Sequence, residues 1–275
     1  MESFEKTYKQ IAETNLWKLF IDLAGDTERE LVSAVGDICA IGLNLSKDII
    51  RFFPTFTLHD DIHSANVCRW MYTLLGEHVK ELTVYEAALL LMAACCHDIG
   101  MSGSDVQKQA MMVRAYPGWD DYFRQNLDDD EEFCETGIIS DRMLRNFVRL
   151  HHHERIGENL RESDWPVILT RKGIRREALL TLCRSHGVSL SRAELSYQRN
   201  RYDLLLCAVL LRLADLLDYD TSRSPAALFY HSSLDMPGDA ERAHSAAEYV
   251  KNQLQEDMMY DQISIKEYKD PFNGS

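Results

Sequence analysis

The sequence predicts an all-α protein. Over most of the chain, apolar residues recur every three to four positions, which is the spacing of one helix face. Alternating strand patterns are scarce, and the best short one covers residues 262–268. With 6 Pro and 13 Gly in 275 residues, the chain also has few of the turn residues that a β-sandwich needs. We therefore expect a helical bundle with small irregular additions.

The N-terminal fifty residues are expected to form two helices. The second of these is opened by the sequence Thr27-Glu-Arg-Glu30. The next helix covers residues 62–78, and His63 lies one turn before Val67 on its inward face. The apolar residues at helical spacing in this segment are Val67, Trp70, Met71, Leu74 and Leu75.

A capping box, Thr83-Val-Tyr-Glu86, opens a very apolar helix that runs to Cys96 and ends near His97-Asp98, with Gly100 as its stop. Another helix runs from Ile139 to about His152. A last one, from about Tyr202 to Leu217, places Asp215 within an otherwise apolar stripe. The inward residues of these two helices are Ile139, Met143, Leu144, Phe147 and Val148, and then Leu204, Ala208 and Leu211.

Two segments look like surface additions. Residues 116–132 contain Pro117-Gly118 and the acidic run 128–132, which we interpret as a solvated loop. The second segment is residues 235–240, with Pro237-Gly238.

The charge of the chain is uneven. The formal net charge is −14, which argues against a protein of general duplex nucleic-acid binding. Residues 142–201 nevertheless carry 13 Lys and Arg against 6 Asp and Glu, so this third is +7 and the rest is −21. A locally basic segment in an acidic protein suits a compact anionic ligand.

The sequence also indicates a cytoplasmic protein that does not enter membranes. No run of about 18 apolar residues is present, and the N-terminus is polar. The seven cysteines are odd in number and form no C-x-x-C motif, so we interpret them as reduced thiols.

Four polar residues interrupt apolar helix faces and suggest a metal site. His97-Asp98 ends the most apolar helix, where an imidazole and a carboxylate are costly to bury unless something uses both. A metal ion does use both, because neutral imidazole and carboxylate are common ligands. His63 and Asp215 occupy comparable inward positions on two other helices.

The order His63, His97-Asp98, Asp215 resembles the HD superfamily of metal-dependent phosphohydrolases, over residues 52–223. Members with two metals have two further histidines, which His186 and one residue of the run 151–153 match. His152 lies four residues after Val148 on the inward face, and His151 remains an alternative. The resemblance implies a metal site in which Asp98 bridges two ions; its ligands are His63, His97, Asp98, His152, His186 and Asp215.

The resemblance implies a single HD-type domain over residues 1–275, with a core at 52–225, N-terminal helices at 1–51 and a C-terminal extension at 226–275. One or two divalent ions (Mn, Fe, Ni, Co, Zn or Mg) would serve as cofactors. The expected reaction is hydrolysis of a nucleotide or oligonucleotide phosphoester by a hydroxide activated between two metals. Arg155 joins Asp98 as a catalytic residue, and the residues expected to bind substrate phosphate are Arg184, Arg212 and Arg223.

The segments around these motifs further resemble an HD variant of bacterial defence and signalling systems, which is often joined to a GHKL-type ATPase domain. A partner ATPase module or a homo-oligomer is therefore expected. Two alternatives stay open: a regulatory or binding module with a structural or slow metal site, and a di-iron oxygenase of the inositol-oxygenase type.

Overall fold

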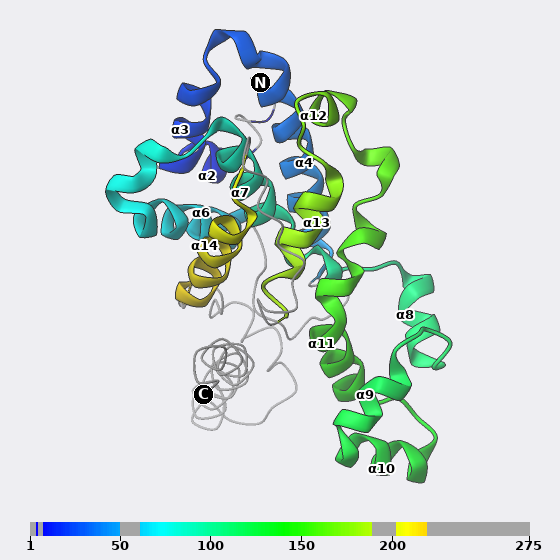
Figure 1. The fold of residues 1–275 in the computed structure, drawn as a ribbon. Helices are drawn as coiled ribbons and strands as arrows, with labels where there is room; N and C mark the ends of the chain where they lie inside the picture. The colour runs from blue at the N-terminus through cyan, green and yellow to red at the C-terminus, as the bar shows by residue number, and fades with distance from the viewer. Residues whose placement is uncertain (1–3, 5–7, 50–60, 189–201, 219–275) are drawn as a thin grey trace, which may run out of the picture.

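The computed structural model describes residue 4 and residues 8–49, 61–188 and 202–218. Within these ranges, every element of regular secondary structure is a helix, so the all-α prediction is confirmed. The strand expected at 262–268 and the surface segment at 235–240 lie outside the described residues. Figure 1 shows α7 (Val84–Cys96) among the helices of the upper part of the molecule, with a further group of helices at the lower end.

Helix α7 forms the centre of the bundle because its sequence is apolar on all sides. Every residue from Glu86 to Cys96 is buried. The predicted capping box is present: the Thr83 hydroxyl accepts from the Glu86 N–H at 3.2 Å, and the Glu86 carboxylate accepts from the Thr83 N–H at 2.8 Å. The helices that pack against α7 are α3 (Asn15–Ala24), α4 (Arg29–Lys47), α6 (Asp61–Leu75), α13 (Arg176–Arg184) and α14 (Leu204–Leu217).

The stretch Val84–Met101 is long and apolar enough to cross a membrane by composition, with a mean hydropathy of 1.3. In the structure, 89% of this stretch is buried inside the protein. Its apolar side chains therefore contact the surrounding helices.

The N-terminal segment forms α2 (Lys9–Ala12), α3 and α4, with a 3-10 helix at Asp26–Glu28. The prediction that Thr27 opens the second helix is wrong, because Thr27 lies inside the 3-10 helix and α4 begins at Arg29. The chain enters this 3-10 helix from Gly25, whose φ of 57° ends α3. The expected helix over 62–78 is α6, followed by a 3-10 helix at Gly76–Glu81.

The apolar stripe of α6 is wider than its buried face. Val67 and Met71 are fully buried, whereas Trp70 and Leu74 are 38% and 39% exposed. Two of the side chains expected to point inward therefore lie at the edge of the contact with the neighbouring helices.

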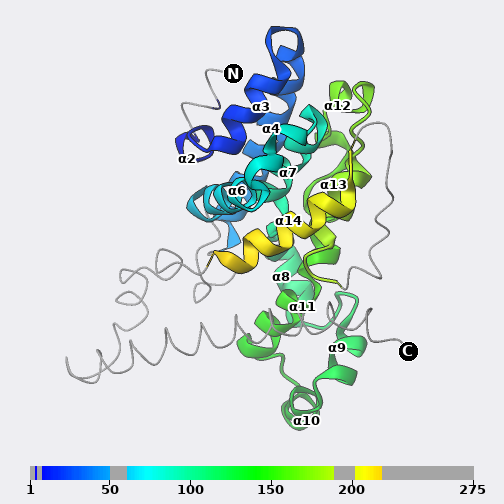
Figure 2. The ribbon, with the colours of Figure 1, turned by 60° about the vertical axis from the view of Figure 1, so that its left-hand side comes forward.

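A second, smaller core lies at the opposite end of the molecule from α2 and α3, as Figures 1 and 2 show. Here α8 (Asp105–Met112), α9 (Trp119–Gln125) and α10 (Leu127–Thr136) enclose aromatic residues against α11 (Asp141–Asn159). The rings of Trp119 and Phe147 stack with centroids 4.1 Å apart. The aromatic side chains in segment 116–132 therefore form part of a core, whereas the sequence analysis interpreted this segment as a surface addition.

The acidic run 128–132 forms the first half of α10, so its interpretation as a solvated loop is wrong. Asp129 is buried and contacts the Tyr122 hydroxyl and the Arg142 guanidinium. Acidic residues in the first turn of a helix are favourable because they face the positive end of the helix dipole. The chain then continues through α11, a 3-10 helix at Glu162–Asp164, α12 (Val167–Arg171) and α13.

Candidate metal centre

Four of the predicted ligands converge from three helices. His97 and Asp98 follow the last turn of α7, His63 lies on α6, and Asp215 lies on α14. The Asp98 Oδ2 atom lies 3.0 Å from His97 Nε2 and 3.3 Å from His63 Nε2. Asp215 Oδ1 lies 3.6 Å from each of these two nitrogens. All four side chains are buried or nearly so, which matches the inward positions expected from the helical periodicity.

A second group of ligand atoms lies on the other side of Asp98. His152 comes from α11, and His186 follows the end of α13. Their Nε2 atoms lie 3.7 Å and 3.6 Å from Asp98 Oδ1. Asp98 therefore directs one oxygen at each group, which is the arrangement expected of a carboxylate that bridges two ions.

The four imidazoles are held in one orientation by their Nδ1 atoms. In each ring Nδ1 lies against an oxygen that can only accept, so Nδ1 carries the hydrogen and the Nε2 lone pair is directed at the centre. The acceptors are Asp218 Oδ2 for His63 at 2.6 Å, the Ala94 carbonyl for His97 at 3.2 Å, the Arg149 carbonyl for His152 at 2.6 Å, and the Cys183 carbonyl for His186.

The distances between ligand atoms fit divalent ions. With bonds of about 2.1 Å, two ligands of one ion lie about 3.4 Å apart in a tetrahedron and about 3.0 Å apart in an octahedron. The separations around Asp98 span 3.0–3.7 Å. The Nε2 atoms of His152 and His186 lie 2.6 Å apart, so an ion bound by both must separate them slightly. Imidazole nitrogens with carboxylate oxygens suit Mn, Fe, Co, Ni or Zn.

The surroundings of the centre shift the pKa values of its histidines in opposite directions. Burial alone lowers the pKa of His97, but the carboxylates of Asp98 and Asp215 outweigh it and hold that pKa well above its usual value. The same pairing with His97 keeps the pKa of Asp215 low despite its burial. Burial and the neighbouring His186 instead hold the pKa of His152 well below normal, so His152 is neutral and ready to coordinate.

The structure distinguishes His152 from His151. His151 Nδ1 pairs with Glu154 at 3.1 Å, and its ring packs on Phe147 with centroids 4.8 Å apart. One residue along a helix is a rotation of about 100°, which carries His151 away from Asp98. Within the described residues, His152 and not His151 belongs to the ligand cluster.

Asp218 contacts a candidate ligand, and the sequence analysis did not single it out. It is buried, its Oδ2 accepts from His63 Nδ1, and its Oδ1 accepts from the Asn66 amide at 2.9 Å. Such outer carboxylates orient a ligating imidazole. The sequence could have pointed to Asp218, because it is a second carboxylate three residues after Asp215 at the end of the same apolar helix.

The arginines expected around the phosphate differ in their placement. Arg155 is buried and donates to the Gly100 and Ser102 carbonyls. Arg212 is also buried and donates to the Val188 carbonyl at 2.7 Å. Arg184 is exposed at the end of α13, two residues before His186, and Arg223 lies outside the described residues.

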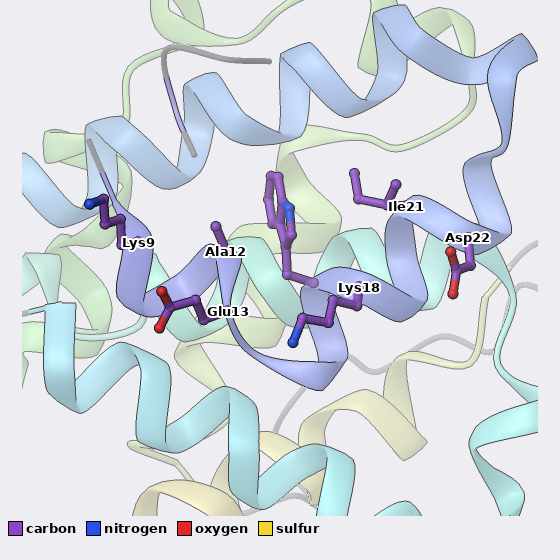
Figure 3. Close-up of a pocket in the computed structure, with 7 residues that line it drawn as sticks. Lys9, Ala12, Glu13, Lys18, Ile21 and Asp22 are labelled. Atoms are coloured by element: carbon purple, nitrogen blue, oxygen red, sulfur yellow. The ribbon is translucent and has the colours of Figure 1, made fainter. Parts of the chain in front are cut away.

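A separate hollow of about 420 Å³ lies between α2 and α3, and Figure 3 shows its lining. Lys9 and Lys18 face it together with Glu13 and Asp22, so the charged groups balance. It shares no residue with the metal centre and gathers no positive charge for a phosphate.

Comparison with protein families finds that the HD-CE model matches residues 53–267. Comparison with curated proteins and with solved structures finds no match. The match covers most of the chain and includes all six converging side chains. With the His/Asp cluster, it indicates a metal-dependent hydrolase of the HD type. The chain therefore belongs to the HD-CE family, within the HD superfamily.

Proposed function

We propose that the protein hydrolyses a nucleotide or oligonucleotide phosphoester at a two-metal centre. The observation that carries this proposal is the division of Asp98 between two groups of histidine Nε2 atoms. One ion would be held by His63, His97, Asp98 and Asp215, and the other by Asp98, His152 and His186. When bound, such ions lower the pKa of a coordinated water and polarise phosphoryl oxygens.

The protein's own residues prepare this centre in two ways, and one proton must be displaced before it can bind metal. Asp98 fixes the spacing of the two groups, because both of its oxygens are directed at ligand atoms. Asp218 and the backbone carbonyls hold the imidazole tautomers that leave Nε2 free to coordinate. The proton that the two carboxylates favour on His97 Nε2 must leave before this nitrogen can coordinate.

Arg184 is our candidate for a cation that meets the substrate. It lies at the end of α13, two residues before His186, and is exposed, so an anion in solution can reach it. It also belongs to the locally basic segment 142–201. A guanidinium suits this role because its planar fork can donate two hydrogen bonds to one phosphate.

The proposal is tested by a screen of mononucleotides, cyclic nucleotides and short oligonucleotides with each divalent metal in turn. We expect phosphate or nucleotide release with at least one metal, and its loss after treatment with a chelator. Asp98→Ala should abolish the release. His78→Ala is a matched control, because His78 is an exposed histidine that pairs with Glu81 outside the centre.

Three outcomes separate the candidate functions. Metal-dependent release that Asp98→Ala removes supports hydrolysis. Bound iron that changes colour with redox state, without release of phosphate, would support an oxygenase. A chain that binds no metal under any of these conditions would support a binding module and contradict our proposal.

A further inference from the structure

The turn that follows Asp98 is the joint between the two halves of the metal centre. It is the 3-10 helix η3 (Ile99–Met101), which packs against α11. The backbone of Gly100 approaches that of His152 so closely that a Cβ at Gly100 would lie 1.8 Å from the His152 carbonyl oxygen. The position of this turn on α11 therefore sets how far Asp98 lies from His152.

Arg155 holds this turn with its whole guanidinium. Its Nη1 donates to the Gly100 carbonyl at 2.6 Å, and its Nη2 donates to the Ser102 carbonyl at 3.1 Å. Its Nε donates to the Tyr116 hydroxyl at 3.2 Å. The side chain is 2% exposed, so these contacts are made away from water.

Asn159 holds the same turn one helical turn further along α11. Its amide donates to the Ile99 carbonyl at 2.6 Å and to the Ser102 carbonyl at 3.1 Å. Carbonyls at the end of a helix lack partners within the helix and must find others. Since His152, Arg155 and Asn159 are spaced by three and four residues, one face of α11 supplies both a ligand and the two side chains that hold the turn.

The surroundings of Arg155 suit a role in ordering the backbone. Within the described part of the chain, no carboxylate forms an ion pair with Arg155. The Tyr116 hydroxyl that it contacts donates to Glu158 at 2.6 Å, and burial together with Glu158 raises the pKa of Tyr116 to about 12. This hydroxyl therefore stays protonated at neutral pH and can accept from Arg155 while it donates to Glu158. A buried guanidinium is costly to desolvate, and here its donors satisfy backbone carbonyls.

We infer that Arg155 and Asn159 are positioning residues that fix the turn 99–102 on α11 and thereby set the distance between the two groups of metal ligands. This inference rests on the metal centre of the proposed function. It gives Arg155 a different role from the direct phosphate contact that the sequence analysis predicts.

The test compares Arg155→Lys with Arg161→Lys, and adds Asn159→Ala. Arg155→Lys keeps the charge but removes the fork that reaches two carbonyls. Arg161 is a matched control because it is largely exposed and pairs with Asp164 in the next turn of the chain. Each full-length variant is titrated with Co²⁺ and followed by its visible spectrum, and melting curves are recorded without metal.

We expect Arg155→Lys to fold and to bind its second Co²⁺ about 10–100-fold more weakly, as found for residues that orient metal ligands. Its cobalt spectrum should also change, because the ligand geometry changes. Asn159→Ala should show the same change to a smaller degree, and it decides the question if Arg155→Lys does not fold. Arg161→Lys should match the wild type.

Wild-type cobalt affinity and spectrum in both folded variants would overturn the inference, and so would an effect confined to the melting temperature. A wild-type chain that binds no cobalt would also overturn it. Phosphoester hydrolysis does not enter this experiment, so a wild type that binds two ions without hydrolysing a substrate contradicts the proposed function alone.

Discussion

The close approach of Gly100 to His152 predicts that Gly100→Ala removes one metal ion from the protein. A Cβ at position 100 would lie 1.8 Å from the His152 carbonyl oxygen, against 3.4 Å for an ordinary contact. The atom it meets belongs to the backbone of α11, which cannot turn aside as a flexible side chain can. The two segments must therefore part by about 1.6 Å.

This displacement is large compared with the metal centre. His152 Nε2 now lies 3.7 Å from Asp98 Oδ1, and a further 1.6 Å would place these atoms about 5 Å apart. Two ligands of one ion with bonds of about 2.1 Å cannot lie more than about 4.2 Å apart. We expect the ion at Asp98, His152 and His186 to be lost and the other ion to be kept, because His63, His97 and Asp215 come from α6, the end of α7 and α14 and not from α11.

The assay is the number of metal ions per chain by elemental analysis after desalting, together with a melting curve. We expect a fall from two ions to one and a destabilisation of about 1–3 kcal/mol. Gly157→Ala, on α11, is the matched control, because a Cβ at position 157 meets only side-chain atoms at 3.5 Å or more. It should retain both ions and gain up to about 1 kcal/mol of stability. Gly100→Ala with two ions and the wild-type melting temperature would refute this reasoning.

Three further predictions concern the ligands. Asp98→Ala should lose both ions and His186→Ala only one, since Asp98 faces both groups; equal losses in elemental analysis would argue against the bridge. Metal affinity should weaken by about tenfold per pH unit as the pH falls below the raised pKa of His97, because the metal must displace its proton. Calorimetry in buffers of different ionisation enthalpy counts that proton, and affinity independent of pH would contradict the assignment. Asp218→Ala should weaken binding about 10–100-fold by freeing the His63 ring, and unchanged Co²⁺ titrations would show that Asp218 does not orient it.

Several features of the site could be predicted from the sequence because they are local. A polar residue that interrupts an apolar helix stripe must point into the core, so His63 and Asp215 were recognisable from periodicity alone. The capping box at Thr83 likewise depends on residues three positions apart. The end of α11 at Asn159 and the helix at the acidic run were missed, because distant packing partners decide them.

The sequence by itself determined the helical class and the types and order of the candidate ligands, since each follows from helical spacing and from the chemistry of the side chains. Only the tertiary structure decided which groups the polar side chains outside the ligand set, such as Arg155 and Asp218, contact. Arg155 reaches the carbonyls of residues 100 and 102, and Asp218 reaches a ring 155 residues earlier in the chain. Neither partner lies within the few residues over which helical periodicity carries information, and a flexible arginine has no direction fixed by its position alone. These contacts exist only because α6, α7, α11 and α14 pack together.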